Sequence, residues 1–301
     1  MPFGTALPAS RDRGPDLRVS SRCDDGLAAE EEIPGHVLAR RSTPSGQALY
    51  TLVRGADGYV LRMHGAADFL VDAEISEVGC RPWRDARPGI AEVLLQATVL
   101  SFVLALRGRV VLHASAVSAG GHVWALAGPS GSGKSTVAAL LCAGGAALVA
   151  DDLACIGPGP QLLGTGPGAE LRLRGGARQV LGLFEAEPPS YETADGRLAI
   201  RPTALPDRPV SLSGILLPEL TGNGRRLRAE RVRGPEAVLQ LLGAARIAGW
   251  RDPGQQQRFF RAMVALAREV PLWRVSVPWT SPLGAVPPAE LLGALERAGG
   301  R

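Results

Sequence analysis

The chain has 301 residues, and 46% of them are hydrophobic, so it can form one large core or two modest ones. Its net charge of +4 comes from arginines spread along the chain, and the densest cluster, residues 225–233, lacks the interleaved aromatic side chains typical of a nucleic-acid site. This composition argues against a nucleic-acid partner and is that of an ordinary soluble protein.

Residues 1–32 contain Pro, Gly, Arg and acidic residues but few large apolar ones, which predicts a disordered tail. They also lack the apolar central region of a signal peptide. The four cysteines show no C-x-x-C spacing and have no histidine at metal-ligand spacing. Two of them, Cys142 and Cys155, lie in apolar runs typical of a core. We therefore expect a cytoplasmic protein.

The stretch from residue 33 to residue 106 predicts a small β-rich N-terminal module. Two β-prone runs, residues 47–53 and 58–65, are joined by a segment with an Asp-Gly pair, which suits the tight turn of a hairpin. The apolar run at 90–106 is about as long as the shortest membrane-spanning helix, but it contains a glutamate and a glutamine. We interpret it as a buried amphipathic helix that closes the module, and we expect no membrane partner.

A second domain is predicted over residues 107–301. It begins with a hairpin around Gly120-Gly121, followed by a glycine-rich loop, a helix that starts near Lys134, and a strand over 146–150. A strand, loop, helix and strand in close succession predict an α/β core. Further elements alternate towards the C-terminus: strands at 213–218 and 272–277, and helices at 234–249, 255–270 and 287–299.

The segment GPSGSGKS, residues 128–135, fits the phosphate-loop motif G-x-x-x-x-G-K-[ST] without a mismatch. In this motif the glycines let backbone N–H groups point at phosphate oxygens, and the following helix adds its positive N-terminal end. Lys134 would reach the β- and γ-phosphates, Ser135 would place its hydroxyl on Mg²⁺, and Thr136 would bond a phosphate. The predicted nucleotide-binding residues are Gly128, Ser130, Gly131, Ser132, Gly133, Lys134, Ser135 and Thr136.

Lys134 is the single lysine in a chain that otherwise uses arginine for its basic residues. That choice indicates a site where a compact ammonium group is required and a planar guanidinium does not fit. A simple glycine-rich turn is the alternative, because the chain has 38 glycines, but it explains neither the lone lysine nor the flanking apolar strand and helix. The expected cofactors are therefore ATP and Mg²⁺.

An apolar run ends abruptly in two adjacent acids, Asp151 and Asp152, soon after the phosphate loop. If this strand lies next to the strand that precedes the loop, one acid can hold Mg²⁺ and the other can accept a proton from an attacking hydroxyl. The alternative is a solvent-exposed Asp-Asp turn. His113 lies in an apolar strand, where it is either a core residue or a group that tunes the pKa of the two acids.

Three segments in this order, LHASAV at 112–117, GPSGSGKST at 128–136 and LVADD at 148–152, resemble the HPr kinase/phosphorylase superfamily, whose catalytic domain is related to phosphoenolpyruvate carboxykinase. The resemblance is closest to stand-alone members found with ribosomal-peptide biosynthesis, some of which are lasso-peptide precursor kinases. It implies an α/β fold, with a P-loop phosphoenolpyruvate carboxykinase-like kinase core over 107–301 beside the small β-rich N-terminal module.

The resemblance also implies roles for individual residues. Asp151 matches the base that activates the acceptor hydroxyl, and His113 matches the histidine next to it. Lys134 joins them as a catalytic residue, and Ser135 and Asp152 are the expected metal ligands. Residues 169–176, AELRLRGG, partly resemble the family's EIRG signature, which implies Glu170 as a further metal ligand and Arg172 or Arg174 as a phosphate contact.

Two departures narrow the expected substrate. Thr136 stands where the protein-regulating members usually have Glu, and their Gly-Leu-Gly signature is absent, so neither HPr as substrate nor the reverse phosphorylase activity is supported. We expect an ATP- and Mg²⁺-dependent kinase of a Ser or Thr hydroxyl on a peptide or protein, such as a ribosomal-peptide precursor. The alternatives are a kinase of a small-molecule hydroxyl and a non-catalytic ATP-binding regulatory module. A homo-oligomer is compatible with the resemblance, because relatives often assemble.

Overall fold

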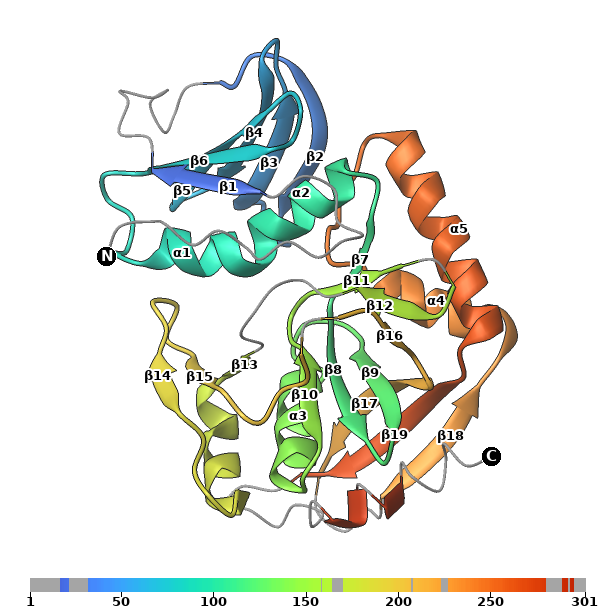
Figure 1. Cartoon of the computed structure of the whole chain (residues 1–301). Coiled ribbons are helices and arrows are strands. Elements are labelled where there is room, and N and C mark those ends of the chain that lie inside the picture. Colours follow the sequence, from blue (N-terminus) through green and yellow to red (C-terminus); the bar gives the residue numbers. More distant parts are fainter. Residues whose placement is uncertain are drawn as a thin grey trace. The chain divides into compact units, whose positions relative to one another are not determined.

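The computed structural model describes residues 17–21, 32–157, 159–163, 170–206, 208–222, 227–279, 289–291 and 293–294 (Figure 1). They form a mixed α/β protein with several β-sheets. The chain divides into two compact units. The first takes the described residues up to Arg109 together with Ile247–Arg258, and the second takes Val110–Arg246 and the described residues from Phe259 onwards.

The first unit is built on a six-stranded sheet in the order β1-β6-β5-β4-β3-β2 (Figure 1). All neighbouring strands are antiparallel except β1 and β6, which are parallel. The β3–β4 pairing confirms the hairpin predicted around the Asp-Gly pair. The strands are β1 (Arg18–Ser21), β2 (His36–Ser42), β3 (Ala48–Arg54), β4 (Gly58–Met63), β5 (Ala67–Asp72) and β6 (Glu77–Pro82).

Alternate residues of these strands face a helical run that forms the other layer of the unit. Leu52, Leu61 and Phe69 are fully buried and share a core with Phe102, because successive side chains of a strand point to opposite faces. The run confirms the helix predicted at 90–106. It consists of α1 (Ile90–Leu94), a π-helical segment (Leu95–Val99) and α2 (Leu100–Leu106). Among the helices of the described part of the chain, none is long and apolar enough to cross a membrane.

Two segments of the first unit differ from the prediction. Arg18–Ser21, within the predicted disordered tail, form strand β1, and Leu17 beside them is buried. The rest of that predicted tail, up to Glu31, lies outside the described residues. Ile247–Arg258, predicted within the second domain, pack with the first unit: the Tyr50 hydroxyl donates to the Ala248 carbonyl at 2.6 Å.

Asp72 closes the turn between β5 and β6. Its carboxylate accepts hydrogen bonds from the Ser76 hydroxyl (2.6 Å) and from the backbone N–H groups of Ser76 (2.7 Å) and Glu77 (2.7 Å). Desolvation raises the pKa of Asp72, but these hydrogen bonds outweigh it, so the pKa lies below its usual value.

We expect Asp72→Asn to lower the free energy of unfolding by about 1 kcal/mol at pH 7, because the carboxylate loses its hydrogen bonds. Since the folded pKa is depressed, this contribution is present above the unfolded pKa of 3.8 and is lost as the pH falls through the folded pKa. Urea unfolding of both proteins from pH 7 to pH 3 measures the effect, with Asp57→Asn in an exposed turn as the control. A difference that stays constant across this range contradicts the assignment.

The second unit contains a six-stranded sheet in the order β10-β8-β9-β17-β19-β18, in which β9, β17 and β19 are parallel neighbours. A four-stranded sheet, β16-β12-β11-β7, and a three-stranded sheet, β13-β15-β14, accompany it. The strands are β7 (Val110–Leu112), β8 (Ala114–Ala119), β9 (His122–Ala127), β10 (Ala147–Ala150), β11 (Ala154–Ile156), β12 (Gln161–Leu163), β13 (Leu171–Leu173), β14 (Ser190–Glu192), β15 (Leu198–Ile200), β16 (Val210–Ser211), β17 (Gly214–Thr221), β18 (Arg228–Val232) and β19 (Leu272–Pro278).

Helices cover both faces of the six-stranded sheet (Figure 1). On one face, Trp124 and Leu126 of β9 pack with α3 (Lys134–Ala143). On the other face, the alternate residues Val123 and Ala125 pack with α4 (Gly234–Gly243) and α5 (Pro253–Glu269), whose residues up to Arg258 belong to the first unit. A 3₁₀ segment, Gly175–Leu183, packs next to α3.

The hairpin predicted around Gly120-Gly121 is confirmed as β8–β9, and the predicted helix after the loop is confirmed as α3. Two details differ from the expectations. The acid-bearing strand is not a direct neighbour of the strand that precedes the loop, because β10 pairs with β8, which lies between β10 and β9. The helix predicted at 234–249 ends at Gly243. The helix predicted at 287–299 lies mostly outside the described residues.

Candidate functional site

The phosphate-loop residues connect β9 to α3, as the motif requires. Gly131 (φ 87°) and Gly133 (φ 93°) have the left-handed backbone that curls the loop towards the first turn of the helix. The buried side chain of Lys134 extends towards the start of the loop, where its ammonium group donates to the carbonyl oxygens of Gly128 (3.0 Å) and Pro129 (2.8 Å). The ammonium group is therefore held where phosphate oxygens would enter the loop.

The pKa of Lys134 reports two opposing influences. Desolvation lowers it, and the negative charges of Asp151 and Asp152 raise it, with a net value of about 8. The acids are thus close enough to act on the lysine electrostatically. The sequence predicted that the two acids lie beside the phosphate loop, and in the structure both lie near Lys134 of the loop.

Leu220, near the end of β17, lies close to Gly133 of the loop. A Cβ on Gly133 would lie 2.6 Å from the Leu220 Cγ, whereas a Cβ on Gly131 would meet no atom within 4 Å. We expect Gly133→Ala to weaken nucleotide binding at least about tenfold more than Gly131→Ala, because both substitutions strain a left-handed backbone but only the first displaces Leu220. Calorimetric titration with ATP and Mg²⁺ measures both affinities. Equal losses would show that Leu220 does not define the loop.

Asp151 lies against the phosphate loop. Its Oδ1 accepts hydrogen bonds from the hydroxyls of Ser135 (3.0 Å) and Ser115, and its Oδ2 accepts one from the Arg172 backbone N–H (3.0 Å). Burial, and secondly the charge of Asp152, raise the pKa of Asp151 to about 6. A carboxylate and a serine hydroxyl that share a hydrogen bond are oxygen ligands of the kind that Mg²⁺ prefers.

Asp152 points to different partners. Its Oδ1 lies 3.1 Å from His113 Nε2, and its Oδ2 accepts a hydrogen bond from Arg246 at 3.0 Å. Desolvation raises the pKa of Asp152, but His113 and Arg246 outweigh it and hold the pKa well below its usual range. The pKa of His113 is lowered, because burial outweighs the hydrogen bond to Asp152. Neither acid belongs to a solvent-exposed turn.

Glu170 belongs to a cluster of charged and aromatic side chains that includes Arg172 and Tyr191. Both of its carboxylate oxygens accept from the Tyr191 hydroxyl at 2.9 Å, and Arg172 pairs with it at 3.2 Å. Arg174 donates to Ser130 of the loop at 3.2 Å, so this arginine reaches the phosphate-binding segment. The metal-ligand role of Glu170 stays a prediction. Within the described ranges, no group of three or more His, Cys, Asp or Glu side chains is placed to hold a metal ion.

The residues of the loop fit a magnesium-bound nucleotide. Ser135 and Asp151 offer neighbouring oxygen atoms, Lys134 offers a buried positive charge, and the buried Ser132 hydroxyl has no hydrogen-bond partner among the described residues. An orphaned hydroxyl of this kind in a phosphate loop is a donor for a phosphate oxygen.

Sequence reasoning missed two residues of the site. Ser115 follows His113 by two positions, so its place in the sequence was the available signal, although His113 lies between β7 and β8 and not within the predicted strand. Arg246 gave no such signal, because it follows a helical segment far along the chain. Its contact with Asp152 is visible only in three dimensions.

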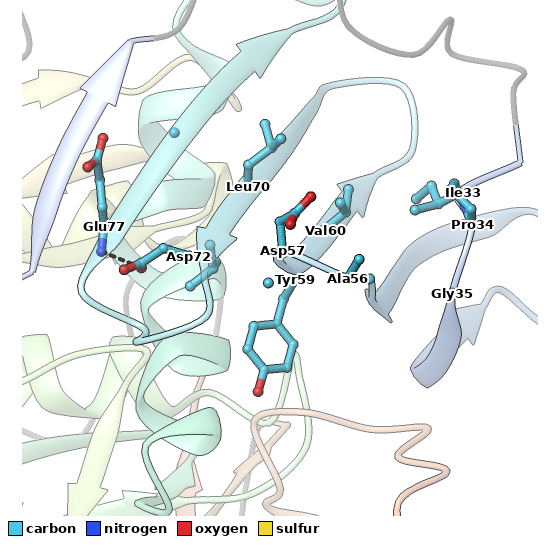
Figure 2. A pocket seen from close by; sticks show the side chains of 14 residues that line it. Ile33, Pro34, Gly35, Ala56, Asp57, Tyr59, Val60, Leu70, Asp72 and Glu77 are labelled. Carbon is cyan, nitrogen blue, oxygen red and sulfur yellow. Dashed lines mark hydrogen bonds between the residues drawn. The ribbon is translucent and has the colours of Figure 1, made fainter.

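The first unit has a separate hollow of about 650 Å³ (Figure 2). Figure 2 shows Val60 and Leu70 on its sheet wall, with Asp57 and Tyr59 from the β3–β4 hairpin and Glu77 from β6. None of the predicted nucleotide, metal or catalytic residues lines it. The residues described above for the candidate phosphate site belong to the second unit.

The fold defines a mixed α/β protein with several β-sheets. Neither the protein-family models nor the curated proteins include one that matches this chain.

Proposed function

We propose that the protein is an ATP- and Mg²⁺-dependent kinase that transfers the γ-phosphate to a Ser or Thr hydroxyl of a peptide or protein. The observation that carries the proposal is the hydrogen bond between Ser135 of the phosphate loop and Asp151 at the end of β10. Two separate segments thereby meet, which supports one shared site for phosphate and metal. The acceptor class comes from the resemblance to the HPr kinase/phosphorylase superfamily.

Little covalent chemistry is required of the protein in phosphoryl transfer, so positioning and neutralisation of charge dominate. Lys134 and the loop N–H groups would hold the β- and γ-phosphates, and Ser135 with Asp151 would hold Mg²⁺. The bound ion would supply neutralisation of the charge on the transferring phosphoryl group. This proposal interchanges the two acids relative to the resemblance, because Asp151, not Asp152, contacts the metal-site serine.

In the same proposal, Asp152 accepts the proton of the acceptor hydroxyl on a carboxylate oxygen as the oxygen attacks the γ-phosphorus. Its low pKa keeps it ionised at neutral pH, and His113 fixes the carboxylate from the other side. An acid with such a pKa is a weak base, so its main contribution is to orient the hydroxyl. The oxygen–phosphorus bond to ADP breaks as the new one forms.

The test is transfer from γ-labelled ATP, with Mg²⁺, to a panel of serine- and threonine-containing peptides that includes candidate precursor peptides. We expect a phosphate-sized mass gain on the peptide, absent when the acceptor residue is replaced by alanine. Label in a small hydroxyl compound but in no peptide would favour the small-molecule kinase. ATP binding without label in any acceptor would favour the regulatory module and overturn the proposal.

A further inference from the structure

Asp152 has an unusual backbone conformation. Its φ of 65° lies in the left-handed region, and Ile75 is the only other non-glycine residue of the described chain with a positive φ. A side chain in this region costs about 1–3 kcal/mol and persists only where the surroundings fix it. The contacts of Asp152 therefore show which residues stabilise this backbone conformation.

Each carboxylate oxygen of Asp152 has its own cationic or imidazole partner. His113 Nε2 lies 3.1 Å from Oδ1, and an Arg246 terminal nitrogen lies 3.0 Å from Oδ2. The side chains of Arg246 and Asp152 are only 15% and 17% exposed, so water competes weakly for this ion pair. The carboxylate is thus held from two directions.

The main chain sets the spacing of the two partners. The His113 N–H donates to the Ala244 carbonyl at 2.8 Å, and the Arg246 N–H donates to the Val111 carbonyl at 3.4 Å. An isolated β-bridge joins the residues between them. Here the second unit begins at Val110, and Arg246 is the last residue before the chain returns to the first unit. The two side chains therefore approach Asp152 from paired backbone segments rather than from independent loops.

We propose that Arg246 is a positioning residue for phosphate transfer: together with His113 it fixes the Asp152 carboxylate so that it faces the acceptor hydroxyl. This inference rests on the proposed kinase function. Arg246 holds the Asp152 carboxylate, which receives the acceptor proton in the proposed reaction, so we expect its removal to affect the transfer step more than nucleotide binding.

Arg246→Ala should lower kcat for peptide phosphorylation about 10²-fold, because a misplaced carboxylate no longer orients the hydroxyl, while KM for ATP changes less than about threefold. Added guanidinium ion should restore part of kcat, and Arg246→Lys should retain more than the alanine variant. The matched control is Arg178→Ala, which removes an exposed ion pair with Glu192 and should leave transfer unchanged. An unchanged kcat, or a loss that guanidinium and lysine both fail to restore, would overturn the inference.

A second readout does not depend on catalysis. With ¹⁵N-labelled histidine, the ring nitrogens of His113 should shift in Arg246→Ala and stay in place in Arg178→Ala, because only the first variant releases Asp152. Unchanged His113 signals in Arg246→Ala would refute the positioning role, even in a protein that phosphorylates no peptide. Absence of transfer in the wild-type protein would instead refute the kinase proposal.

Discussion

Replacing Lys134 by alanine is expected to lower phosphate transfer by about 10³-fold and to weaken ATP binding as well. Lys134 supplies the only ammonium group of a side chain in this protein, and it already lies within hydrogen-bonding distance of the loop carbonyls. Without it, no ammonium group would meet the β- and γ-phosphates, and only neutral loop donors and the bound Mg²⁺ would offset their charge there. Calorimetry with ATP and label transfer to peptide measure the two effects separately.

The substitution Lys134→Arg tests why this position alone keeps lysine. Lys134 is buried at the first turn of α3, so we expect the planar guanidinium to restore little binding. The pKa of about 8 adds a pH dependence: in the free protein the ammonium loses its proton as the pH rises through this value, so ATP affinity should fall between pH 7 and pH 9. Arg228→Lys on the exposed edge strand is the control. Tight ATP binding by Lys134→Ala would contradict the proposal that this loop binds the nucleotide.

Local signals predicted the phosphate-loop region well. The Gly-Gly turn, the apolar β9 strand and the helix that ends before Gly144 are each determined by neighbouring residues, and the structure contains all three. The two acids were predicted near the loop on the condition that their strand lies directly beside β9, and they lie near the loop although this condition is not met. Their strand pairs with β8 and not with β9, and strand order depends on non-local pairing that a sequence pattern does not specify.

The contacts of Asp152 show where local reasoning fails. Residues 244–249 contain no strong helix breaker before the final glycine, so the pattern predicted a helix that continued through Arg246. In the structure, α4 ends at Gly243 and the following residues pair with Val111–His113 instead. Tertiary hydrogen bonds outweigh a small difference in helix propensity here, and they bring the guanidinium to the acid. Strand β1 in the predicted N-terminal tail was missed for a similar reason, because it forms by pairing with the distant strand β6.

The two acids should fail in different ways when each is replaced by asparagine. Under the proposed function, Asp152→Asn should lower kcat about 10³-fold with an unchanged Mg²⁺ requirement, because it removes the carboxylate that orients the acceptor hydroxyl and takes its proton, while Ser135 and Asp151 would still hold the ion. Asp151→Asn should raise the Mg²⁺ concentration needed for half-maximal transfer, because it removes the charged partner of the metal-site serine. Magnesium titrations of transfer in both variants measure these responses.

The two assignments of the acids predict opposite results in this experiment. If Asp151 is the base, as the resemblance implies, Asp151→Asn abolishes transfer at every Mg²⁺ concentration and Asp152→Asn shifts the Mg²⁺ dependence. The structure favours the first pattern because Asp152 already has His113 and Arg246 on its two oxygens, whereas Asp151 faces Ser135. Ser115→Ala is the matched control. It removes a hydrogen bond from Asp151 but leaves Ser135 in place, so a small rise in Mg²⁺ requirement is expected and loss of transfer is not.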